Sequence, residues 1–382
     1  MTAKPWVLRK VSLLEVLFTA GAIFGIGAAM LLLPAAAADG ARKGLTYCSE
    51  ILIPSLFPFM VLSAFVVKSG LAARLGRLLE PITRFLFRLP GCTGATILIS
   101  MIGGYPAGAR GVKALIEQGE ITPKQGERML CFTVGAGPAF VISVVGAGLL
   151  GSGKAGVILF VSQAAASLAI GILAGLFTRG REETISCSRR EACGRQDVSA
   201  ALVDSSADSA KGMMNMCAFV VLFSSLIGLI QESGVGDMLA RFLISLGVSE
   251  RAAGSILPIL LEVTGGCANA AQAGASPQLI SFALGWAGAC VHFQISASLA
   301  GIRFSKLRFT LFRFLHGIIA AGISYLGFLL FPDTAEAFST TTEPLTSAFS
   351  SHAPGSVALV FTCAFFLFSL CSRGMDFKRK KC

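Results

Sequence analysis

One acidic side chain stands inside an otherwise apolar stretch in the second half of the chain. Glu262 lies near the end of the run from Ile256 to Val263 and is followed by Gly265 and Gly266. An ionisable group among apolar residues is costly to remove from water, so such a position favours a functional role. We therefore expect Glu262 to bind a ligand or a cation. The alternative is a structural role as a helix cap or an ion-pair partner.

Three further polar side chains accompany Glu262. Asn269 follows the two glycines, and His292 and Gln294 lie in the next apolar segment. An imidazole can pair with a carboxylate or relay a proton, and an amide oxygen can coordinate a ligand. The alternatives are a hydrogen-bonded core histidine at position 292 and an amide that satisfies a helix end at position 269. The first interpretation predicts one polar site around Glu262.

Glycine and proline interrupt two apolar runs in the first half. The run Thr93–Pro106 is short for a bilayer span and ends in Gly103-Gly104-Tyr105-Pro106, while Gly135-Ala-Gly137-Pro138 interrupts the run Leu130–Leu150. Non-helical backbone persists at membrane depth only where protein buries it or water fills a cavity. Both loops are therefore candidates for a binding site, although close helix packing and a packed kink are the alternatives.

The candidate binding residues come from these loops and from the polar cluster of the second half. They are Gly103, Gly104, Tyr105, Pro106, Gly135, Gly137, Pro138, Glu262, Gly265, Gly266, Asn269, His292 and Gln294. We expect no catalytic residue, no resident metal and no cofactor among them.

Other chemistry lacks the residues that it needs. The eleven cysteines form no C-x-x-C pair, so neither a zinc site nor a disulfide framework is expected. Residues Gly148 to Lys154 have the spacing of a phosphate-binding loop, but Ala155 stands where a magnesium-binding Ser or Thr is required. An intramembrane enzyme would need a carboxylate pair, a Ser-His arrangement or an H-E-x-x-H motif, and the sequence offers none. We expect a protein that is not an enzyme.

The composition indicates that these elements lie in a lipid bilayer and not in water. Of 382 residues 54% are hydrophobic and only 14% are charged, against about 25% charged in soluble proteins. A mean hydropathy of +0.74 leaves too few charges to cover a soluble fold. The net charge of +11 gathers at the ends of apolar runs, which is typical of cytoplasmic loops and does not indicate nucleic acid. The partner is therefore the lipid bilayer.

These features predict an all-α polytopic membrane protein with about eight transmembrane helices and two re-entrant hairpins. The expected spans are Leu13–Pro34, Ile51–Val67 (broken by Pro54 and Pro58), Leu130–Leu150, Ala155–Phe177, Met213–Ile230, Gln278–Ala300, Phe309–Phe331 and Ser356–Cys371, and the hairpin runs are Thr93–Pro106 and Ser255–Thr264. Leu71–Pro90 and Gly234–Arg251 are expected to be amphipathic connectors, and Arg179–Lys211 a polar loop. The Ala35–Ala38 run imitates a signal-peptide cleavage site, but the apolar segment before it is longer than a signal sequence requires.

The same order of elements occurs twice, which indicates an internal repeat. The segment Phe132–Val141 aligns with Phe282–Val291, with four identities in ten positions. The connector Lys68–Arg88 carries five positive charges and one negative, whereas Glu232–Arg251 carries two positive and three negative. This difference has the sign that an inverted repeat predicts, with both termini in the cytoplasm. Inverted repeats with broken helices typically form a substrate or ion site near the membrane midplane.

We divide the chain accordingly into five parts. They are an N-terminal transmembrane helix (1–44), a first repeat (45–178), a polar cytoplasmic loop (179–211), a second repeat (212–302), and C-terminal transmembrane helices with a basic tail (303–382).

Five ordered motifs together resemble a known family. They are Ile53-Pro-Ser-Leu-Phe-Pro-Phe59, Gly104-Tyr-Pro-Ala-Gly-Ala-Arg110, Gly137-Pro-Ala-Phe140, Leu261-Glu-Val-Thr-Gly265 and Gly288-Ala-Cys-Val-His-Phe-Gln294. The set resembles the YlbJ family of sporulation integral membrane proteins, which belongs with the nucleoside recognition, or Gate, domains. The resemblance covers residues 45 to 305.

The resemblance implies a multi-pass protein of the bacterial cell membrane that is needed for sporulation and linked to the spore cortex. It also implies a Gate-like core for transport or for binding a nucleoside-like small molecule or a coupling cation. The alternative is a structural or assembly protein of the sporulation membrane that keeps the fold without transport. The oligomeric state stays open.

Overall fold

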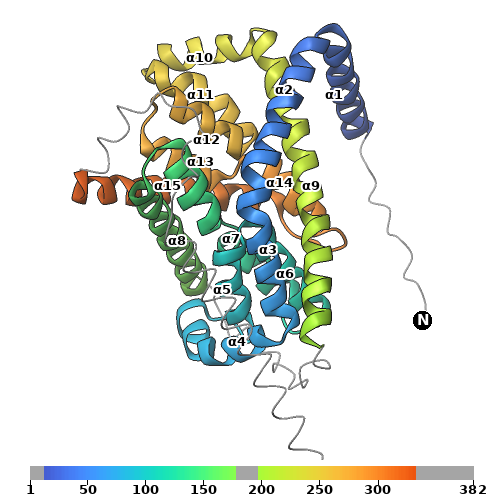
Figure 1. Ribbon diagram of the computed structural model, residues 1–382, viewed down its shortest axis with the longest axis vertical. Coiled ribbons are helices and arrows are strands. Elements are labelled where there is room, and N and C mark those ends of the chain that lie inside the picture. Colours follow the sequence, from blue (N-terminus) through green and yellow to red (C-terminus); the bar gives the residue numbers. More distant parts are fainter. Residues whose placement is uncertain (1–12, 178–196, 333–382) are drawn as a thin grey trace, which may run out of the picture. The chain divides into compact units, whose positions relative to one another are not determined.

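The computed structural model describes residues 13–177 and 197–332, and all regular structure in these residues is helical (Figure 1). The described residues lie within the first of two structural units, residues 1–340. The predicted span Ser356–Cys371, the basic tail and most of the predicted polar loop lie outside the described residues. The predicted all-α class is confirmed for the described part of the chain.

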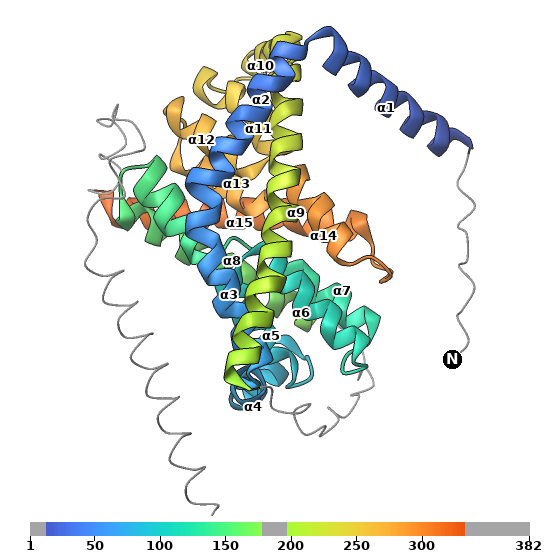
Figure 2. The ribbon, with the colours of Figure 1, turned by 45° about the vertical axis from the view of Figure 1, so that its right-hand side comes forward.

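Two long helices lie side by side and run in opposite directions. One is built from α2 (Pro34–Thr46), η1 (Tyr47–Leu52) and α3 (Ile53–Lys68), which form 35 continuous residues, and the other is α9 (Val198–Glu232), also 35 residues. The start of each packs on the end of the other (Figures 1 and 2). Small residues allow this close approach, since a Cβ atom on Gly40 would lie 2.8 Å from the Cα of Ser225.

The first long helix corrects the prediction that prolines break the run Ile51–Val67. The helix passes through Pro54 and Pro58 without interruption. Proline removes a backbone donor and crowds the preceding turn, but it is tolerated near the start of a helix. Here η1 is a π-helix that ends just before Pro54, so the regular helix restarts with this proline in its first turn.

The second long helix corrects the prediction of a polar loop over Arg179–Lys211. From Val198 onward the segment is helical. One side chain in each turn is buried along one face: Val198, Ala201, Ser205, Ser209 and Met213. Two of these five residues are serines, so the apolar residues alone do not show a clear helical period. The spacing of three and four residues between the buried positions is nevertheless that of a helix.

The same order of elements follows each long helix. The first half contains α4 (Leu71–Ile82), η2 (Thr83–Phe87), α5 (Thr93–Gly103), α6 (Tyr105–Glu117), α7 (Pro123–Thr133), η3 (Ala139–Leu149) and α8 (Gly153–Leu176). The second half contains α10 (Val235–Ser245), α11 (Glu250–Leu261), α12 (Val263–Gln272), α13 (Pro277–Trp286), α14 (Gly288–Ser298) and α15 (Lys306–Leu330). Each half is thus an amphipathic connector, two interrupted helix pairs and one long apolar helix.

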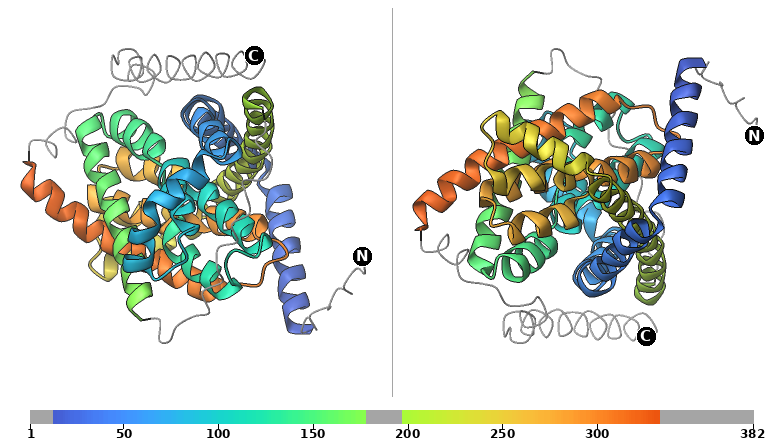
Figure 3. Two further views of the ribbon diagram at one scale, coloured as in Figure 1. Left: turned by 90° about the horizontal axis from the view of Figure 1, so that it is seen from below. Right: turned by 90° about the horizontal axis from the view of Figure 1, so that it is seen from above.

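The connectors α4 and α10 lie at opposite ends of the long helix pair (Figures 1 and 2). Seen along that pair, the interrupted helices gather on one side of it (Figure 3). The helix starts follow local capping rules. Thr122 and Gln125 form a capping box at α7, and the hydroxyl groups of Ser152 and Ser305 accept backbone N–H groups at the starts of α8 and α15.

Five helical segments among the described residues are long and apolar enough to cross a membrane: Pro34–Lys68, Gly153–Leu176, Val198–Glu232, Pro277–Ser298 and Lys306–Leu330. The chain is therefore a multi-pass helical protein, but the predicted count of eight spans is not confirmed. The run Leu130–Leu150 is divided between α7 and η3, and the apolar part of α1 (Leu13–Leu32), residues Ala20–Leu32, is shorter than these five segments.

Candidate functional site

Four interruptions divide the short helices. Gly104, with φ 73° and ψ −170°, separates α5 from α6, and Glu262, with φ −146° and ψ 129°, separates α11 from α12. Residues 134–138 separate α7 from η3, and Ala287, with φ 72°, separates α13 from α14. The predicted interruptions at Gly104 and at Gly135–Pro138 are present.

The second hairpin is interrupted three residues earlier than the double glycine suggests. Gly265 and Gly266 lie in the first turn of α12, after the break at Glu262. A Cβ atom on Gly266 would lie 2.6 Å from the Cα of Ile259, so this glycine allows α12 to pack on α11. The extended backbone of Glu262 itself turns the chain, and the glycines serve close packing.

Glu262 is buried with 1% of its surface exposed, and its carboxylate binds the start of α12. Oε1 accepts the backbone N–H of Thr264 at 2.9 Å, and Oε2 accepts that of Gly265 at 2.6 Å. A helix N-terminus carries a partial positive charge and unpaired N–H groups, so it stabilises a carboxylate at this position. The structural role of Glu262 as a helix cap is therefore present, and the carboxylate also faces a cavity.

This cavity, which we call the central cavity, is lined by both halves of the chain. Its lining residues are Leu52, Leu56, Met60, Gly103, Gly104, Tyr105, Pro106, Gly137, Phe140, Met216, Val220, Glu262, Val263, Thr264, Val291 and Gln294. The space within it that a water centre can occupy is about 40 Å³. One water needs about 10–15 Å³ on this measure, so the cavity holds about three waters or one small cation. A nucleoside would require it to widen.

The interruptions pack against one another around the central cavity. The ideal Cβ position of Gly104 lies 3.4 Å from the backbone nitrogen of Gly137, and that of Gly137 lies 3.0 Å from the carbonyl oxygen of Ile102. In the second half, the ideal Cβ position of Gly288 lies 3.1 Å from the Cα of Glu262. The helices α6, η3, α12 and α14 thus all begin near these contacts. Their N-termini make the surroundings of Glu262 electropositive.

The structure brings together only part of the predicted set. Gly103, Gly104, Tyr105, Pro106, Gly137, Glu262 and Gln294 line the central cavity. Gly265 contributes its backbone N–H to Glu262, and Gly266 lies in the same turn. Gly135, Pro138, Asn269 and His292 are not among the lining residues of this cavity.

The expected pairing of His292 with Glu262 is not formed. His292 Nδ1 lies 2.8 Å from the carbonyl oxygen of Gly288, and its ring centroid lies 4.6 Å from that of Trp286 and 5.2 Å from that of Phe309. Its side chain therefore packs among aromatic rings. Gln294, two residues later, lines the central cavity and donates to the sulfur of Cys290 at 3.2 Å.

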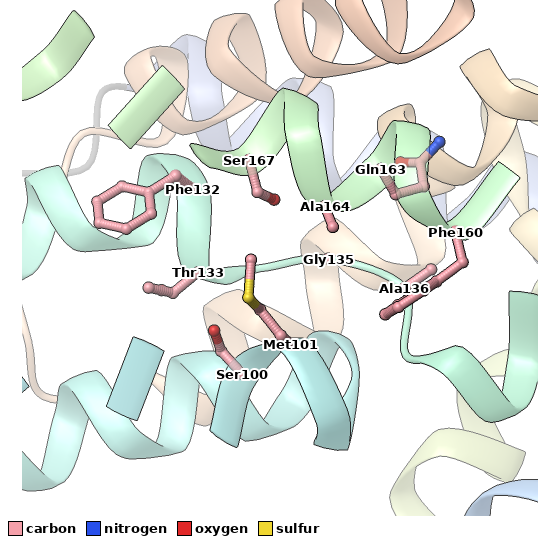
Figure 4. Close-up of a pocket in the computed structure, with 10 residues that line it drawn as sticks. All are labelled: Ser100, Met101, Phe132, Thr133, Gly135, Ala136, Phe160, Gln163, Ala164 and Ser167. Carbon is pink, nitrogen blue, oxygen red and sulfur yellow. The ribbon is translucent and has the colours of Figure 1, made fainter. Parts of the chain in front are cut away.

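A second, smaller cavity lies between α5, the α7–η3 interruption and α8 (Figure 4). It offers about 20 Å³ to a water centre and is lined by Ser100, Met101, Phe132, Thr133, Gly135, Ala136, Phe160, Gln163, Ala164 and Ser167. The hydroxyl groups of Ser100 and Thr133 donate to carbonyls of their own helices. The amide of Gln163 crosses to α13, where it donates to the Ser281 carbonyl at 2.8 Å. This space suits a single water.

Two buried cationic or ionisable residues of α15 were missed in the sequence. Arg313 and His316 both have 0% of their surface exposed. Arg313 Nε and Nη2 donate to the Gly285 carbonyl at 3.0 and 2.6 Å, and Nη1 donates to the Val134 carbonyl. The signal was present, because an ionisable residue inside the apolar run Phe309–Phe331 meets the same criterion that singled out Glu262.

Among residues 13–177 and 197–332, no group of three or more His, Cys, Asp and Glu side chains is arranged to hold a metal ion. The fold and the site together define a multi-pass helical membrane protein with interrupted helices around a buried carboxylate. Residues 50–152 match the Gate family, which is described as nucleoside recognition.

The chain is also similar to the sporulation integral membrane protein YlbJ of Bacillus subtilis (strain 168). The two are 27% identical over 316 residues, which cover 75% of this chain and 76% of that protein. No solved structure was found to match the chain. The resemblance expected from the five motifs is confirmed by these two findings.

Proposed function

We propose that this protein is a Gate-type membrane protein of a spore-forming bacterium, in which the central cavity binds a small ligand or a coupling cation and supports its transport. The role in sporulation follows from the name of its relative, and a role in spore cortex formation is part of this proposal. In this proposal the protein carries out binding or transport and catalyses no covalent chemistry.

One observation carries the proposal: a buried carboxylate faces a cavity that is lined by interrupted helices from both halves of the chain. Building such a site costs free energy, because interrupted helices lose backbone hydrogen bonds and Glu262 loses its hydration. A purely structural core would need neither the interruption at position 262 nor the carboxylate that caps the helix after it. The arrangement is the usual architecture of a midplane transport site.

The size of the central cavity favours a small first occupant, and the negative charge of Glu262 opposes the partial positive charge of the surrounding helix starts. About 40 Å³ accommodates a partly dehydrated monovalent cation together with a water. The carboxylate of Glu262 and the Gln294 amide supply oxygen ligands, and the interrupted backbone supplies carbonyls. A nucleoside-like molecule would enter after the two hairpins separate, in a more open conformation than the one described.

We also propose that the two halves are inverted repeats with both chain termini in the cytoplasm. The opposite ends occupied by α4 and α10 support this arrangement, as do the opposite charge balances of the two connectors. An inverted repeat provides two exchangeable conformations of its halves, which alternating access requires.

The test is ligand-dependent thermal unfolding of the detergent-purified chain. Wild type, E262Q and the control E250Q are compared with sodium, potassium or choline chloride and with uridine or adenosine, each at several pH values. Glu250 is exposed on α11 and lies outside the cavity lining, so E250Q removes a carboxylate without changing the site. A ligand at one hundred times its Kd stabilises the folded state by about 2.7 kcal/mol.

A saturable shift in wild type and E250Q that is absent from E262Q is the expected result. A shift that survives in E262Q would place the ligand elsewhere and overturn the assignment of Glu262. No shift with any of these probes, together with a lower but ligand-independent stability of E262Q, would favour the structural or assembly role over binding.

A further inference from the structure

Two helix C-termini meet at one buried guanidinium group. Helix α7 ends at Thr133 and helix α13 ends at Trp286, each just before an interruption. Arg313 of α15 donates to the carbonyls of Val134 and Gly285, which lie at these two ends. We propose that Arg313 mechanically couples the α7–η3 and α13–α14 interruptions, so that the cavity walls on the two sides hold or move together.

The charge balance at Arg313 supports this role. A helix C-terminus carries about half a negative charge, so two of them together offset one guanidinium charge. No acidic side chain of the described segments forms a hydrogen bond with Arg313; besides the two carbonyls it contacts His316 Nδ1 at 2.6 Å. Because a guanidinium only donates, this ring nitrogen is an acceptor. The helix ends therefore act as the counter-charge, and loss of either contact weakens the balance at the other.

The two carbonyls that Arg313 binds lie one position apart in the repeat alignment. In the alignment of Phe132–Val141 with Phe282–Val291, Val134 corresponds to Leu284 and Gly135 to Gly285. The Leu284 carbonyl accepts the hydroxyl of Tyr105 at 2.7 Å. Tyr105 itself lines the central cavity from the first half, so the end of α13 is bound to both α6 and α15.

The residues beyond each interruption connect Arg313 to the central cavity. Gly137 and Phe140, just after Val134, line the cavity, and Gly288, just after Gly285, lies against the backbone of Glu262. A shift at either carbonyl therefore moves a wall of the cavity. Arg313 does not line that cavity, so we assign it as a positioning residue.

A planar guanidinium is suited to this bridge and an ammonium is not. Arginine presents five N–H donors in a fixed fork, whereas lysine presents one compact charge at the end of a flexible stem. R313K thus keeps the charge but cannot bind both helix ends in the same geometry. This makes R313K a milder variant than R313Q for separating coupling from charge burial.

Amide hydrogen–deuterium exchange of the full chain in detergent tests the coupling. The variants are R313K, Y105F, Y105F combined with R313K, and the control R308Q. Arg308 is an exposed cation of the same helix that pairs with Glu127, so R308Q changes neither interruption. The coupling rests on the proposed function, because it identifies how the walls of the proposed binding cavity are held. The exchange experiment uses no ligand, so it can show the coupling to be wrong even if the cavity binds a ligand, and to be right even if it does not.

We expect Y105F, which releases one α13 carbonyl, to raise exchange about fivefold in residues 288–295 and also in residues 138–145. R313K alone should raise exchange in both segments. Adding Y105F to R313K should then cause no further rise in residues 138–145, because the bridge that transmits the change is already absent. R308Q should leave both unchanged.

Three outcomes would overturn the coupling. In the first, Y105F acts on residues 288–295 alone while Arg313 is present. In the second, the effect of Y105F on residues 138–145 persists in the R313K background, because Tyr105 would then act directly through α6. In the third, R313K raises exchange at one interruption only or equally along the whole chain, which would make Arg313 an ordinary stability residue.

Discussion

Replacing Glu262 separates its capping role from its charge. In E262A both backbone N–H groups at the start of α12 lose their acceptor; Thr264 is buried and Gly265 is half-buried. Hydrogen bonds to a charged group contribute about 1.5–3 kcal/mol, and loss of a neutral helix cap costs about 1 kcal/mol. We expect E262A to lower the free energy of unfolding by about 3 kcal/mol. E262Q keeps one acceptor oxygen and places an NH₂ group beside the other donor, so about 2 kcal/mol is expected.

The assay is unfolding in mixed micelles with a rising fraction of a denaturing detergent, followed by circular dichroism. S152A is the matched control, because Ser152 caps α8 through a single neutral bond to Ala155 N–H at 3.2 Å. It should cost about 1 kcal/mol. The expected order of loss is therefore E262A, then E262Q, then S152A.

The result that refutes this reasoning is an E262Q protein as stable as wild type, with E262A no worse than S152A. That outcome would mean that the carboxylate does not stabilise the α12 N-terminus. Glu262 would then be a net cost to the fold, and its burial would have to be explained by ligand binding alone.

Two further predictions concern the hairpin and the topology. G104A should destabilise the protein by about 2 kcal/mol, because φ 73° with ψ −170° is almost restricted to glycine, whereas the exposed helical position in G254A should be neutral or slightly stabilising in the same unfolding assay. L78C and M238C place a cysteine on the exposed faces of α4 and α10. If the repeats are inverted, a membrane-impermeant maleimide added to intact cells should label only one of the two variants, and both after lysis. Labelling of both variants in intact cells, or of neither, would contradict the placement of α4 and α10 on opposite sides of the membrane.

Much of the fold follows from hydropathy and from glycine and proline positions. The amphipathic connectors, the short hairpin helices and the interruption at Gly135–Pro138 were all predictable, because each depends on local sequence. The long helices were not. Pro54 is tolerated because of a π-helix just before it, and the polar first half of α9 is helical because it packs on α3, so both depend on tertiary context.

Those parts of the site that depend on local sequence were predictable. Glu262 stands out because an acidic residue is rare in an apolar run, and Gly104 because only glycine adopts its backbone angles freely. The sequence predicts the second break at Gly265, three residues after its position at Glu262, since a double glycine is a stronger local signal than an extended acidic residue. Arg313 does not stand out in the sequence, because it follows the cations Arg303, Lys306 and Arg308, and cations in such a cluster are usually solvated. Only the fold reveals that its head group reaches two helix ends.

The position of Trp286 makes the second half of the site accessible to intrinsic tryptophan fluorescence. Its indole Nε1 donates to the Leu260 carbonyl at 3.2 Å, just ahead of the break at Glu262, while its ring packs at a tilt against His292 beyond the break at Ala287. The sequence has only two tryptophans, and the other is Trp6. A W6F protein would thus carry a single tryptophan, which touches both interruptions of one repeat and can be excited selectively over the three tyrosines. Emission wavelength and lifetime would then follow hairpin opening in real time, in bilayers, without any attached dye.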